Sequence, residues 1–131
     1  MAIPNRFQSG FRLEDGDAIN KALATPQWQT NYGITALAGG ARNSSTPVLV
    51  LGANTVTTVA TAADSVVLPV AVAGSVVWLR NADSADAVQV FANGSDTING
   101  TAGATGISVA AAKSVLFVAA TNNVWFSLLT A

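Results

Sequence analysis

Short runs of apolar and β-branched residues, separated by polar and glycine-containing turns, fill the chain from residue 46 onward. Runs of this length and spacing are typical of β-strands. The clearest two occupy residues 75–81 and 87–91, and the second leads into the turn dipeptide Asn93-Gly94. Since only a short polar stretch separates them, we expect these two runs to form a β-hairpin.

Further strands are predicted on both sides of this hairpin. They fall at residues 48–51, 55–60, 65–68, 96–98, 107–109, 114–119 and 124–129. Residues 52–54 are expected to form a turn, and residues 121–123 are expected to join the last two strands. About eight short strands at this spacing predict a mainly β fold, a β-sandwich or a jelly-roll-like barrel.

Residues 1–45 differ from this pattern because they show no sustained alternation of apolar and polar positions. They contain four of the six basic residues and several scattered aromatic residues. A run of acids precedes residues 18–23, where apolar spacing predicts a short helix that ends before Pro26. We therefore divide the chain into an extended N-terminal arm with a short helix, residues 1–45, and a β-sandwich oligomerisation domain, residues 46–131.

Several predicted strands are apolar at consecutive positions, which a strand with one solvent-facing side would not be. This holds for residues 76–79, 115–118 and 124–126. We expect both sides of these strands to be covered, which predicts a homo-oligomer. The interface residues expected from these runs are Trp78, Phe117 and Trp125, with a place in the core as the alternative for the two tryptophans.

Composition excludes several classes of function. Only 10% of the residues are charged and the net charge is −1, so nothing attracts nucleic acid or an anionic membrane. The chain has no His and no Cys, which removes the commonest general base and the commonest metal ligands. We therefore expect no enzymatic activity, no cofactor and no metal, and neither nucleic acid nor membrane as a partner.

The acidic residues around the predicted hairpin leave one alternative. Asp83, Asp86 and Asp96 could supply oxygen ligands for Ca²⁺. Their spacing lacks the alternating acidic pattern of a dedicated calcium loop, and aspartate also serves to hold turns through its own backbone bonds. The turn interpretation is favoured.

Several motifs resemble those of a known family. They are F-R-L-E-D-G-D-A-I-N at residues 11–20, I-T-A-L-A-G-G at 34–40, S-D-T-I-N-G-T-A at 95–102, K-S-V-L-F-V at 113–118 and N-V-W-F-S-L at 123–128. Together with the strand pattern of residues 76–106, they resemble the small β domains of tailed-bacteriophage virion proteins. Head decoration (cement) proteins and head fibres belong to this group, and the likeness covers most of the chain.

The resemblance implies a structural protein on the outer surface of a phage capsid. Its partners would be the major capsid protein and further copies of itself, commonly as a homotrimer, with the N-terminal segment engaging the shell. Aromatic residues and Arg dominate interface energetics, so the expected capsid contacts are Phe7, Phe11, Arg12 and Trp28. The shortness of the chain favours a cement protein, and the alternative is a head-fibre or tail appendage module that binds a receptor or glycan.

Overall fold

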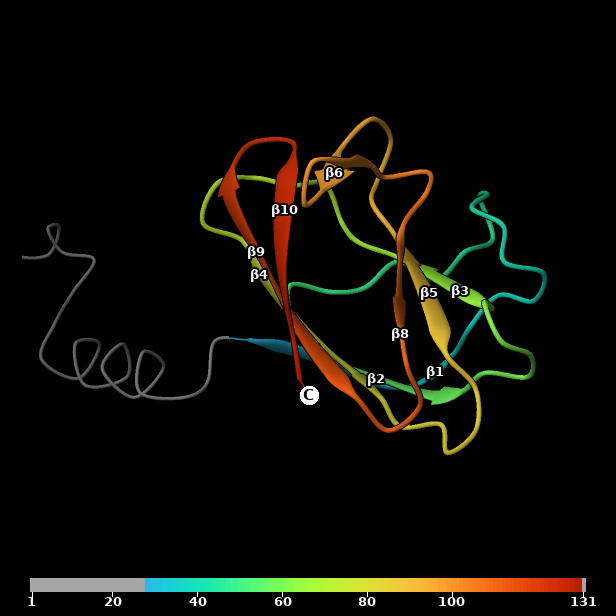
Figure 1. The fold of residues 1–131 in the computed structure, drawn as a ribbon. Helices are drawn as coiled ribbons and strands as arrows, with labels where there is room; N and C mark the ends of the chain where they lie inside the picture. The colour runs from blue at the N-terminus through green and yellow to red at the C-terminus, as the bar shows by residue number, and fades with distance from the viewer. Residues whose placement is uncertain (1–27, 131) are drawn as a thin grey trace, which may run out of the picture.

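A computed structural model of the protein describes residues 28–130, which contain ten β-strands and no helix (Figure 1). The mainly β fold is confirmed, with ten strands where about eight were expected. The strands are β1 (Gln29–Thr35), β2 (Gly52–Thr58), β3 (Ser65–Val67), β4 (Val76–Asn81), β5 (Val88–Phe91), β6 (Thr97–Ile98), β7 (Thr101–Ala102), β8 (Ile107–Val109), β9 (Ser114–Thr121) and β10 (Val124–Leu129).

The strands form two sheets that the chain visits in turn. The larger sheet has the order β1-β2-β4-β9-β10-β6-β7, and the smaller has the order β3-β5-β8. Between β2 and β5 the chain alternates sheets at each strand, and β2 pairs in parallel with β4 while β3 pairs in parallel with β5. The chain thus coils as a β-solenoid does, with each turn placing one strand in each sheet.

This coiling corrects the expected β-sandwich or jelly roll, in which neighbouring strands are mostly antiparallel. A further parallel pair, β1 with β2, extends the coil at its N-terminal end. The C-terminal strands are mostly antiparallel: β9 pairs with β4 and β10, and β8 pairs with β5. The expected connection of β9 and β10 across residues 121–123 is confirmed, since these two strands are antiparallel neighbours.

The predicted hairpin of residues 75–81 and 87–91 is wrong. Both segments are strands, β4 and β5, but they lie in different sheets. The buried Asn81 side chain holds the bend between them: Nδ2 donates to the backbone oxygens of Asp86 at 2.9 Å and Val109 at 3.0 Å, and Oδ1 accepts from the N–H of Asp83. These bonds direct the chain into the second sheet, where an ordinary hairpin turn would return it to the first.

Residues 48–60 also differ from the prediction of two strands with a turn at 52–54. The structure has one strand there, β2, preceded by an isolated bridge at Val48. The buried Asn54 side chain makes this possible, because Oδ1 accepts from the N–H of Val50 at 2.8 Å and Nδ2 donates to its carbonyl at 2.9 Å. Asparagine usually occurs within a turn. Asn54 instead lies in the strand that follows the turn and stabilises that turn through its side chain.

Residues 29–35, which we expected to belong to an arm outside the sheets, form the edge strand β1. Ile34 and Ala36 are buried in the core, whereas most of β1 is exposed. Its polar sequence showed no alternation because a strand at the edge of a sheet is wet on both faces over much of its length. The predicted helix at residues 18–23 lies outside the described residues.

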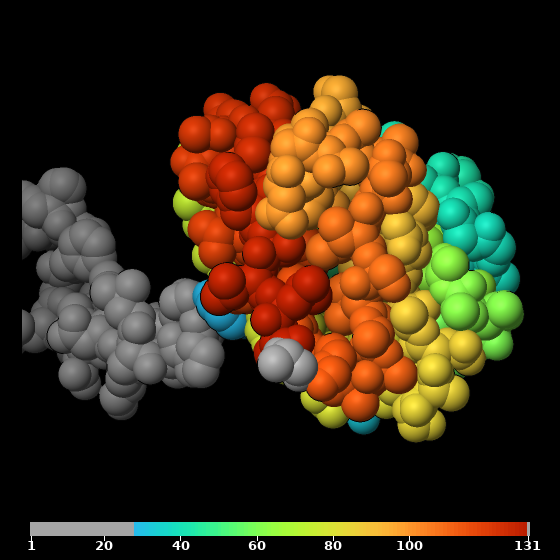
Figure 2. Space-filling model, in the orientation of Figure 1, coloured from blue at the N-terminus to red at the C-terminus, as the bar shows by residue number. Residues whose placement is uncertain are grey.

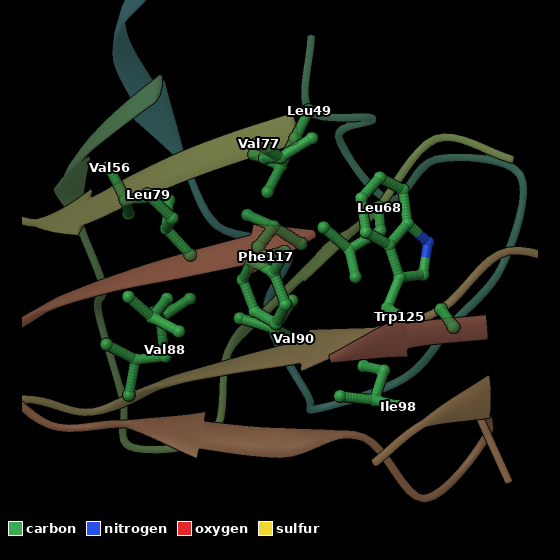
Figure 3. Close-up of a cluster of buried hydrophobic side chains, with 14 of the residues drawn as sticks. Leu49, Val56, Leu68, Val77, Leu79, Val88, Val90, Ile98, Phe117 and Trp125 are labelled. Atoms are coloured by element: carbon green, nitrogen blue, oxygen red, sulfur yellow. The ribbon is translucent and has the colours of Figure 1, made fainter. Parts of the chain in front are cut away.

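The core lies between the two sheets and is almost entirely aliphatic (Figure 3). Its largest side chains are Phe117 on β9 and Trp125 on β10, which meet edge to face with ring centroids 6.5 Å apart. Valines and leucines of both sheets surround this pair, among them Val77, Leu79 and Val90. The inward side chains of β4, β9 and β10 therefore belong to the core. Only the outward side chains of these strands can contact another molecule.

Candidate interaction surface

An apolar surface lies on the solvent side of the larger sheet. Along β4 and β9 buried and more exposed residues alternate, as expected when one side of a strand faces the core. Most outward positions of β4, β9 and β10 are nevertheless apolar too. We call these six residues the outer apolar face: Val76, Trp78, Leu116, Val118, Phe126 and Leu128.

The strand register places these side chains in two adjacent rows. Trp78 lies opposite Leu116, which lies opposite Leu128; Val76 lies opposite Val118, which lies opposite Phe126. Paired residues in neighbouring strands point to the same side of a sheet, so the six form one continuous patch. Phe126 is 51% exposed and Leu128 is 71% exposed, whereas Val76, Trp78 and Leu116 are half-buried, so the patch is most open to solvent along β10.

Polar side chains border this patch at one end. The next row in the register contains Thr55 of β2, Arg80 of β4 and Ser114 of β9. Arg80 is the one charged residue at the outward positions of β2, β4, β9 and β10, and Nη1 donates to the backbone oxygen of Ala112. An apolar centre with a polar border is the usual anatomy of a protein interface.

The structure corrects two of the three expected interface residues. Phe117 and Trp125 are 0% exposed and point into the core, so they cannot contact another molecule. Trp78 is half-buried and belongs to the outer apolar face. Sequence reasoning missed Phe126 and Leu128, although their alternation with Trp125 would have placed them on the side opposite to it.

Trp28 stands at the edge of a groove and is 52% exposed, as a residue that contacts another molecule has to be. The groove has a volume of about 410 Å³ and is lined by Trp28, Leu51, Gly52 and residues 73–76. Val76 also belongs to the outer apolar face, so the groove and the face are continuous. The capsid contact of Trp28 stays a prediction, and Phe7, Phe11 and Arg12 lie outside the described residues.

A second exposed aromatic residue, Tyr32, had not been singled out from the sequence. It lies on β1 opposite Thr55 and is 81% exposed. The sequence around Tyr32 does not alternate between apolar and polar residues, so it does not indicate to which side of the strand this side chain points. The structure places it at the polar border of the outer apolar face, since Thr55 belongs to that border.

Two of the three acids considered as calcium ligands, Asp83 and Asp96, accept hydrogen bonds from backbone N–H groups, which agrees with the turn interpretation. Asp83 accepts from the N–H groups of Asp86, Ala85 and Val59, and these bonds lower the pKa of its carboxyl below the usual 3.8. The buried Asp96 accepts from the N–H of Ala71 at 2.8 Å.

Two structural findings and three comparisons complete this description. Within residues 28–130 no group of three acidic, histidine or cysteine side chains is placed to hold a metal ion. The same residues contain no helix of the length and hydrophobicity needed to cross a membrane. Comparison with protein-family models, curated proteins and solved structures finds no match.

Proposed function

We propose that this protein is a non-enzymatic structural component of a tailed-phage virion that binds the outside of the capsid and stabilises contacts between major capsid subunits. The observation that supports the proposal best is the outer apolar face. A chain that leaves Trp, Phe and Leu side chains together on one sheet, and has few charges elsewhere, has a surface suited to permanent assembly. The resemblance of its motifs to small virion β domains supplies the kind of assembly.

The proposed partners are the major capsid protein and further copies of this chain in a homotrimer. The N-terminal residues Phe7, Phe11 and Arg12, together with Trp28, are proposed to contact the capsid. A shell under internal pressure is held by many contacts in parallel, so a protein present in many copies stabilises it even if each contact is modest.

The copy number of this chain in purified virions tests the proposal. Quantitative mass spectrometry gives the ratio of this chain to the major capsid protein in the same particles. If the virion contains about as many copies of this chain as of the major capsid protein, to within an order of magnitude, the cement role is supported. Absence of the chain from the particle would overturn the virion role.

The alternative function is a head-fibre or tail appendage module that binds a receptor or glycan. The exposed aromatic rings of Trp28 and Tyr32 favour it, because sugars stack on exposed aromatic rings. A low copy number in virions together with binding on a glycan array supports this alternative, and a high copy number with no glycan bound rejects it.

A further inference from the structure

We infer that the outer apolar face is the surface through which copies of this chain associate, each face being covered by the same face of other copies. The inference rests on the self-association included in the proposed function and assigns a surface to it. It does not depend on the identity of the capsid.

The first argument is size. The outer apolar face covers three neighbouring strands, β4, β9 and β10, and its two rows span about three residues of each. At about 4.8 Å between strands and about 3.3 Å per residue, these rows cover roughly 150 Å² before the relief of the side chains is counted, and the whole outward side of β1, β2, β4, β9 and β10 covers roughly 500 Å². One partner contributes about 800 Å² to an interface of standard size, so the outer apolar face can form the centre of such an interface, with the outward sides of β1 and β2 in its rim.

The second argument is chemical matching. The centre of the face has no charged group, and Arg80 lies at its border. A strongly charged partner would form no favourable ion pairs with this uncharged centre. An apolar partner surface of similar shape would bind more tightly with each apolar contact that is removed from water. The same face of another copy is such a surface, and it is present at equal concentration wherever the protein is made.

The third argument is permanence. Phe126 and Leu128 are more than half exposed, and both lie on β10, where Trp125 on the opposite side is completely buried. Interfaces of permanent homo-oligomers are more apolar than those of partners that also exist separately. A closed assembly also limits growth, because faces turned toward one symmetry axis leave none of the outer apolar face free to recruit more copies. In the proposed trimer, three faces surround one axis and each contacts both neighbours.

The test measures the mass of the full-length chain by analytical ultracentrifugation. The double variant Phe126→Glu/Leu128→Glu places charges in the centre of the face at positions that are already exposed. Its matched control is Val70→Glu, because Val70 is also apolar and 54% exposed but lies in the connection after β3. We expect the wild type and the control to be oligomers and the double variant to be a 13.2 kDa monomer with an unchanged circular dichroism spectrum.

The outcomes separate the two levels of the proposal. A double variant that keeps the wild-type mass overturns the assignment of the face but leaves self-association standing. A monomeric wild type overturns both, while the virion count still decides the capsid role. A wild-type dimer that dissociates in the double variant supports the face and contradicts the trimer.

A second measurement covers a double variant that fails to fold. The chain has no cysteine, so Val118→Cys introduces one thiol on the face, and Val70→Cys introduces one thiol away from it. A short thiol-reactive cross-linker should join copies of the Val118→Cys protein and leave Val70→Cys copies separate. Equal cross-linking of the two proteins would contradict the inference.

Discussion

A single buried carboxylate connects three parts of the backbone. Asp64 is almost completely buried, and its two oxygens accept from the N–H groups of Gly39, Ala60 and Thr61, each at 3.1 Å. The three hydrogen bonds are part-buried, and hydrogen bonds to a charged acceptor are stronger than those between neutral groups. Asp64 therefore fixes the loops on both sides of β2 relative to the start of β3.

Replacing Asp64 by Ala should be among the most damaging changes to a polar residue. Three N–H groups would lose their acceptor, and the free energy of unfolding should fall by about 3 kcal/mol. Urea denaturation followed by circular dichroism measures the change. The control is Asp86→Ala, which removes the same charge from a half-buried position, and similar losses in the two variants would show that Asp64 has no special role.

Asp83 should make stability depend on pH in acid. Its carboxyl has a lower pKa in the folded protein than the usual 3.8, because three backbone N–H groups stabilise the charged form. The stability that it contributes is therefore complete above the unfolded pKa and is lost as pH falls through the lower folded pKa. We expect the urea midpoint of the wild type to fall with pH in this window, and that of Asp83→Asn to fall less.

Urea titrations at a series of acidic pH values measure this difference. All other acids are common to the two proteins, so they cancel in the comparison. Parallel pH profiles for the wild type and Asp83→Asn would show that the three hydrogen bonds do not couple to stability.

At the scale of elements, the docking of β1 depends on one glycine. Gly52 begins β2 with φ +124°, and a Cβ there would lie 2.3 Å from the backbone oxygen of Gln29. Gly74 also has a positive φ, +91°, but a Cβ there meets nothing within 4 Å. Comparing alanine substitutions at Gly52 and Gly74 therefore distinguishes the effect of backbone strain from that of a collision with a neighbouring strand.

We predict that Gly52→Ala detaches β1 whereas Gly74→Ala only strains a turn. The strain common to both should cost about 1–2 kcal/mol, and the collision adds to it in Gly52→Ala alone. Hydrogen exchange of the amides of Gln29–Thr35 reports on β1 directly. Faster exchange of these amides in Gly52→Ala only is the expected result, and equal exchange in the two variants would contradict it.

The positions of most strands could be predicted from the sequence, but their partners could not. The predictions for residues 107–109 and 124–129 match β8 and β10, and that for 75–81 contains β4. Alternation tells which residues share a side of a strand but not which strand lies beside it. The hairpin failed for this reason, since the pairing of β4 with β2 and β9 is set by residues far away along the chain.

The interaction surface was predicted in part for a related reason. Consecutive apolar residues showed correctly that β4, β9 and β10 are apolar on both sides. When both sides are apolar, periodicity cannot tell which one faces the core, so Phe117 and Trp125 were assigned to the interface and Phe126 was not. The larger rings point inward because the space between two sheets can enclose them completely.

For the whole molecule, the core described above is formed by residues between Ile34 and Trp125. Deleting residues 1–24 should therefore leave the fold intact but abolish binding to capsids, because Phe7, Phe11 and Arg12 are removed. Thermal unfolding measures the first effect, and co-sedimentation with capsids that lack this protein measures the second. Capsid binding that survives the deletion would move the proposed contact surface to residues 28–130.

The position of β4 has a consequence for how the protein is made. It lies between β2, which is synthesised before it, and β9, which is synthesised near the end of the chain. Until β9 leaves the ribosome, one edge of the coil stays open and the core lacks Phe117 and Trp125, so the nascent chain cannot fold stably in stages. Pairings between such distant segments also fold slowly, on about the millisecond to second scale. Newly made chains should therefore expose apolar side chains and an open sheet edge until β9 and β10 are complete.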